Sequence, residues 1–118
     1  MKTFTSARKL KVFSKTYDLK FVPNLEGEGT DGNRGALDGQ QLFYDEEIRI
    51  RKNLPEHIQW RTTWHEALHS ILMQIGWPEL GSNETFIESI SNCVCQVIED
   101  NQFMSNPKLL TKTRRNGK

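Results

Sequence analysis

One short segment of the chain combines residue types and a spacing that suit metal chemistry. His65, Glu66 and His69 form a His-Glu-x-x-His motif. On an α-helix, residues four apart lie about 40° apart around the axis and about 6 Å apart along it, so both imidazoles can reach one ion. Glu66 lies about a quarter-turn from His65, where it can accept a proton from a metal-activated water instead of binding the metal.

The motif is specific enough to support a functional prediction. The chain has three histidines, and random placement would give this pattern with a probability on the order of one in a hundred. The competing interpretation is a pair of histidines on a helix surface beside an exposed glutamate. A catalytic zinc site needs three protein ligands, and the motif supplies two of them.

The third ligand must be an acidic residue or a cysteine, because His69 is the last histidine in the chain. Glu88 is the first choice, since it lies one turn inside the next predicted helix and beside its apolar stripe. Asn92, one turn further on, is predicted to hydrogen-bond a ligating histidine. Glu84 ranks second, because a carboxylate in the first turn of a helix also suits the helix dipole. Cys95 shares the face of Glu88 and leaves a lesser His-His-Cys alternative.

Two predicted helices would carry these residues. The first covers residues 56–75, after a possible cap at Asn53 and with Pro55 tolerated in the first turn. Gly76 would end this helix, and a short loop at residues 77–82 would follow. The second helix covers residues 83–101, with apolar residues at helical spacing.

Strand patterns precede the helices. Residues 9–13, 18–22, 41–44 and 47–51 have apolar stretches or alternation typical of strands, with a hairpin turn between the last two. The glycine-rich residues 26–39 are predicted to form a mobile surface loop. The fold class expected is therefore α+β: a small antiparallel or mixed sheet, with an H-E-x-x-H active-site helix and a second ligand-bearing helix packed on it.

Composition limits the classes of function that the chain can have. Its 118 residues, of which 36% are hydrophobic and 26% charged, suit one globular domain over residues 1–110 with a basic tail at residues 111–118. The net charge of +1 argues against nucleic-acid binding, for which the tail alone offers too few charges. No apolar run is long enough for a membrane span or a signal peptide, and two cysteines form no disulfide framework, so a reduced, cytoplasmic protein is expected.

Beyond single motifs, the stretches RTTWHEALHSILMQ (residues 61–74) and ETFIESISNCVCQVIEDN (residues 84–101) resemble the small zinc metallopeptidases of phage and prophage genomes, which are similar to gluzincins. In gluzincins the second motif is a glutamate ligand followed four residues later by an aspartate that supports a ligating histidine. The resemblance therefore implies Zn²⁺ held by His65, His69 and Glu88, with Asn92 in place of that aspartate. It also implies the cytoplasm of a host cell, if the protein is phage-encoded.

These observations predict a zinc-dependent metallopeptidase that hydrolyses peptide bonds in a protein or peptide substrate, with Glu66 as the catalytic base. The strand at residues 47–51 is the predicted edge along which an extended substrate pairs. The alternative is a zinc-binding interaction protein with weak or no catalysis. The oligomeric state stays open.

Overall fold

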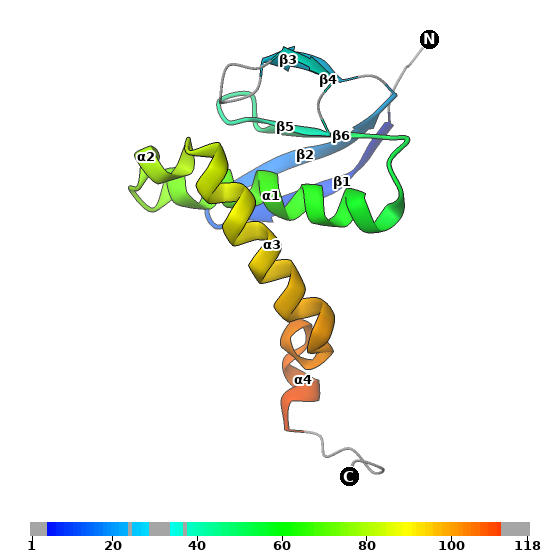
Figure 1. The fold of residues 1–118 in the computed structure, drawn as a ribbon, viewed down its shortest axis with the longest axis vertical. Coiled ribbons are helices and arrows are strands. Elements are labelled where there is room, and N and C mark those ends of the chain that lie inside the picture. Colours follow the sequence, from blue (N-terminus) through cyan, green and yellow to red (C-terminus); the bar gives the residue numbers. More distant parts are fainter. Residues whose placement is uncertain (1–4, 24, 29–33, 37, 112–118) are drawn as a thin grey trace.

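The computed structural model describes residues 5–23, 25–28, 34–36 and 38–111. Within these ranges the chain has an α+β fold with a four-stranded mixed sheet, a separate two-stranded ribbon and four α-helices (Figure 1). The predicted fold class is confirmed at this level. The predicted basic tail lies outside the described residues apart from Thr111.

The four-stranded sheet is made of two hairpins joined side by side. β1 (Thr5–Val12) pairs antiparallel with β2 (Lys15–Val22), and β5 (Gly39–Leu42) pairs antiparallel with β6 (Glu47–Arg51). β2 and β6 pair in parallel, which gives the order β1-β2-β6-β5. The predicted strand at residues 47–51 is confirmed, but its expected role as an edge is wrong. It is an inner strand because it pairs on both sides, and the edges are β1 and β5.

The glycine-rich segment forms more structure than predicted. β3 (Glu26–Glu28) and β4 (Arg34–Ala36) pair antiparallel as a ribbon, and residues 29–33 between them lie outside the described residues. The prediction of a loop rested on the shortage of apolar side chains. A two-stranded ladder is made by backbone hydrogen bonds, which glycine forms as well as other residues do. The prediction is therefore wrong for these two strands.

Helices follow the sheet in sequence. They are α1 (Glu56–Gln74), α2 (Pro78–Gly81), α3 (Glu84–Asp100) and α4 (Pro107–Leu110), with a 3₁₀ turn at Gln102–Ser105. Pro55 is the N-cap residue of α1, and its carbonyl accepts bonds from Ile58 N and Gln59 N at 2.9 Å. Asn53 is therefore not the cap that was predicted. The expected loop at residues 77–82 instead contains the single turn α2, which Pro78 starts.

The core lies between the sheet and α1. Tyr17, Ile48 and Ile50 are fully buried on the sheet, and Ala67 packs on them from α1. Figure 1 shows α3 crossing α1 and then running away from the sheet with α4 at its end. Among the described residues, no helix is both long enough and apolar enough to cross a membrane.

Candidate metal centre

Two imidazoles lie side by side on the buried middle of α1. The exposed fractions of His65 and His69 are 8% and 5%, and their ring centroids are 5.0 Å apart. The competing interpretation of the motif required histidines on a helix surface beside an exposed glutamate. The structure instead buries all three motif residues, Glu66 included.

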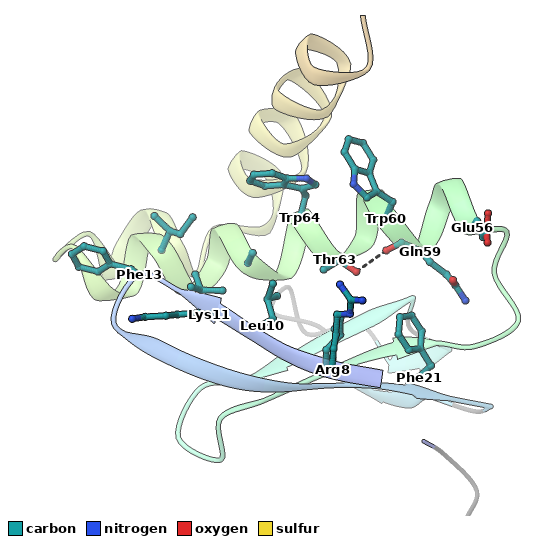
Figure 2. Close-up of a pocket in the computed structure, with 14 residues that line it drawn as sticks. Arg8, Leu10, Lys11, Phe13, Phe21, Glu56, Gln59, Trp60, Thr63 and Trp64 are labelled. Carbon is teal, nitrogen blue, oxygen red and sulfur yellow. Dashed lines mark hydrogen bonds between the residues drawn. The ribbon is translucent and has the colours of Figure 1, made fainter. Parts of the chain in front are cut away.

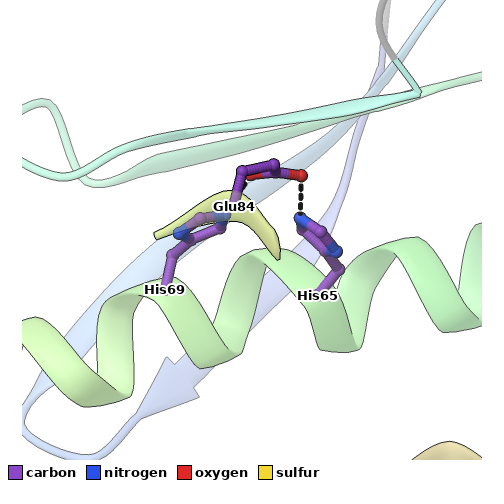
Figure 3. A group of neighbouring side chains, drawn as sticks. All are labelled: His65, His69 and Glu84. Carbon is purple, nitrogen blue, oxygen red and sulfur yellow. Dashed lines mark hydrogen bonds and ion pairs between the residues drawn. The ribbon is translucent and has the colours of Figure 1, made fainter. Parts of the chain in front are cut away.

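The carboxylate of Glu84 faces both rings (Figure 3). Glu84 Oε2 lies 2.8 Å from His65 Nε2, and Oε1 lies 3.1 Å from His69 Nε2. One candidate ligand atom from each of the three residues lies within 4.8 Å of the others, the one such group found in the described part of the chain. Glu84 is placed there because Asn83 caps α3, its side chain accepting a bond from Phe86 N at 2.9 Å.

The two histidines are also held at their other ring nitrogens. Nδ1 of His69 lies 2.6 Å from the carbonyl oxygen of Gly81, and Nδ1 of His65 lies 3.1 Å from Glu88 Oε1. A carbonyl oxygen can only accept, so Nδ1 of His69 must donate. In the neutral ring, Nε2 of His69 then carries a lone pair that faces the Glu84 carboxylate. Nε2 and the carboxylate oxygen are both acceptors, so their contact is favourable only if a proton or a metal ion lies between them.

The electrostatics of the rings agree with this need for a cation. Burial opposes the charged form of both imidazoles, but the hydrogen bonds to Glu84 and the nearby carboxylates outweigh it. The pKa values of His65 and His69 are therefore raised above the ordinary value. A divalent cation bound between these groups would compete with protons for the two imidazoles.

Glu66 has a drier environment than the other acidic residues near it. Burial raises the pKa of Glu66 to about 7, although the two histidines pull it down. Gly39, the first residue of β5, packs against it: a Cβ atom there would lie 3.1 Å from Glu66 Oε2. The Glu66 carboxylate makes no hydrogen bond to any residue that the structure describes.

The residue predicted as third ligand has a different contact. Glu88 is 60% exposed at its side chain and touches Nδ1 of His65, on the ring side away from Glu84. Asn92 donates to Glu88 Oε2 at 3.3 Å, so it supports Glu88 and not a histidine directly. The structure thus places Glu84, the second-ranked residue, between the two Nε2 atoms.

A spacing in the sequence could have indicated this arrangement. The predicted pair was Glu88 and Asn92, but Glu84 and Glu88 are also four residues apart and are both acidic. If the ligand is taken as Glu84 and the supporting residue as Glu88, one carboxylate faces the two Nε2 atoms and the other contacts Nδ1 of His65. Glu84 was ranked lower because the helix dipole already explained its position.

The two cysteines and the third histidine lie outside the cluster. Cys95 is fully buried and Cys93 is exposed, as expected for residues two apart on a helix. His57 is exposed and lies 3.1 Å from Glu99 Oε2. Glu99 also accepts two bonds from Arg61, at 2.7 and 2.9 Å, which tie the end of α3 to α1.

None of the known protein-family models, curated proteins or solved structures matches the chain. The chain's own residues and their geometry are therefore the basis for assigning a function.

Proposed function

We propose that the protein is a zinc-dependent metallopeptidase in which His65, His69 and Glu84 hold the metal and Glu66 is the catalytic base. One observation carries the proposal: two Nε2 atoms and a carboxylate converge while both Nδ1 atoms are held by acceptors. Metal-ligating histidines generally have their other nitrogen held in this way, which fixes the tautomer and the ring orientation.

The donor set favours zinc and a catalytic role. Two imidazole nitrogens and one carboxylate oxygen form one of the usual ligand sets of catalytic zinc, and three protein ligands leave a fourth position open. When bound, zinc acts as a Lewis acid that polarises a peptide carbonyl and acidifies water. Mg²⁺ and Ca²⁺ prefer sites made of oxygen atoms, which the two histidines do not supply.

The chain's own groups suit the proton transfers of peptide hydrolysis. Glu66 is next to a ligand in sequence and is buried, and no described residue occupies its carboxylate oxygens with a hydrogen bond. It is therefore available to take the proton of the attacking water and to return it to the leaving amine. In this proposal Glu88 and Gly81 orient the two rings.

The position of an end strand beside Glu66 supports a peptide as substrate. β5 is an end strand of the sheet, and its first residue, Gly39, lies against Glu66. An extended peptide can pair with such an edge through main-chain hydrogen bonds. β5 takes the role that was first expected of the strand at residues 47–51.

The experiment combines zinc analysis with a cleavage assay. Purified wild-type protein is expected to hold one zinc ion per chain and to cleave members of a synthetic peptide mixture, with products identified by mass spectrometry. Glu66→Gln should keep the zinc and lose cleavage, while His65→Ala should lose both. A wild-type protein without zinc after refolding with the metal would overturn the proposal. Zinc without cleavage in the wild type would favour the inactive zinc-binding protein.

A further inference from the structure

A recess lies between β1 and α1. It has a volume of about 740 Å³ and is lined mainly by apolar side chains, among them Leu10 and Phe21 from the sheet and Trp60 and Trp64 from α1 (Figure 2). Ala67 also lines it and is two residues from both His65 and His69, which is about 200° around a helix. The recess, hereafter the β1–α1 groove, therefore faces away from the candidate metal centre.

The strand that borders this groove has a free edge. β1 is the other end strand of the sheet, and within the described part of the chain it pairs with β2 alone. Val12 and Lys15 close the two-residue hairpin turn, and backbone bonding alternates along an antiparallel pair. The backbone N–H and C=O groups of Lys9 and Lys11 therefore point away from β2. An edge of this kind is a template for another extended chain.

The charges on β1 indicate what kind of chain fits. Lys9 is paired with Asp18 at 2.5 Å, but the side chains of Arg8 and Lys11 have no hydrogen-bond or ion-pair partner among the described residues. Figure 2 shows Arg8 reaching from β1 towards α1, next to Phe21. Two β1 strands placed edge to edge would bring these cations together, which is unfavourable. Acidic residues on the incoming strand would be attracted.

We propose that the β1–α1 groove binds an extended segment of a partner protein, in which apolar residues alternate with Asp or Glu. The segment adds to β1 as a fifth strand through the free backbone groups of Lys9 and Lys11. Its apolar side chains enter the groove between Leu10 and Trp60, and the alternating acidic side chains lie on the opposite face of the sheet, beside Lys11. At one groove-facing position an Asp or Glu replaces the apolar residue and pairs with Arg8. This site uses none of the residues proposed for catalysis, so it does not depend on the proposed function.

Selection from a displayed library of random nine-residue peptides tests the proposal on the full chain. Enriched peptides are expected to alternate apolar and acidic residues, with one further acidic residue at a groove-facing position opposite Arg8. Arg8→Glu should weaken their binding about tenfold or more. Lys11→Pro should abolish it, because proline removes an outward N–H that β2 does not use. Lys108→Glu on α4 makes the same charge change away from the groove and should leave affinity unchanged.

Several results would overturn the proposal. The selection could enrich no peptides, or it could enrich basic peptides. Peptide binding could also persist in both the Arg8→Glu and the Lys11→Pro variants. A wild-type dimer that Lys11→Pro converts to a monomer would assign the edge to a second copy instead. Binding of a single-stranded oligonucleotide that Arg8→Glu removes would assign it to nucleic acid. Circular dichroism and urea unfolding must first show that each variant is folded.

Discussion

Glu84 and Glu88 lie one turn apart on α3 and face opposite sides of the same imidazole. If Glu84 is the ligand, Glu84→Gln removes a charged donor from the metal and should reduce zinc affinity the most. Glu88→Gln keeps a hydrogen-bond acceptor near Nδ1 of His65 and should reduce affinity only about 10- to 100-fold, the usual effect at a residue that orients a ligand. Competition with a chromophoric chelator measures both. The reverse order of effects would restore Glu88 as the ligand.

Glu47 gives the fold a predictable pH dependence at a single residue. Burial raises its pKa, but bonds from Lys20 and Arg49 outweigh this, so the pKa of Glu47 is lowered. A carboxylate with a lowered folded-state pKa stabilises the protein above its unfolded pKa of about 4.3, and this contribution is lost as the pH falls through the folded value.

Glu47→Gln should therefore cost about 1 kcal/mol of unfolding free energy at pH 7 and progressively less below pH 4. Urea unfolding across this pH range measures the difference. Glu79→Gln, which makes the same change at an exposed residue, is the control. An equal cost of Glu47→Gln at pH 7 and pH 3 would contradict the assignment.

At the scale of elements, the sequence predicted best where local patterns decide the structure. The 3.6-residue pattern and Gly76, which has a φ of +92°, place the end of α1 within one residue. The alternation of Ile48 and Ile50 gives β6 its bounds. The third ligand was harder to predict because it depends on how α3 meets α1, which no local pattern encodes.

The way in which α3 packs on α1 depends partly on the packing of Gly81. A Cβ atom at Gly81 would lie 3.2 Å from Met73 N and 3.3 Å from His69 O, so α2 lies close against α1 there. Close packing lets the Gly81 carbonyl reach His69 and starts α3 beside the motif. The sequence shows a glycine in a short connection but not the neighbour that requires it.

The contact between β5 and α1 can be tested as a pair of elements. A Cβ atom at Gly39 would lie 2.5 Å from Thr62 Cγ2, so Gly39→Ala should push β5 away from α1 and cost about 1–3 kcal/mol. Thr62→Ser removes the clashing methyl group and should recover part of this loss in the double variant. The unfolding free energies of the wild type, the two single variants and the double variant form a double-mutant cycle. Strictly additive costs would show that the two side chains do not meet.

For the whole molecule, the candidate metal centre joins α3 to the body made by the sheet and α1. A metal that binds only the folded state adds to its stability, by about 2.7 kcal/mol when free zinc is 100-fold above Kd. Removing zinc with a chelator should therefore lower the Tm of the wild type by about 10 °C or more. His69→Ala should show no chelator effect. Calorimetry with equal Tm values for the wild type in zinc and in chelator would contradict this prediction.

The parallel pairing of β2 with β6 has a consequence for how the chain folds. The β1–β2 and β5–β6 hairpins are each made of neighbouring segments, so each can form quickly by itself. The parallel pairing of β2 with β6 can form only after the two ends of the segment at residues 23–38 come together. The entropic cost of this closure grows slowly with the length of the segment. Inserting glycines between β3 and β4 would thus slow folding and leave the rate of unfolding nearly constant.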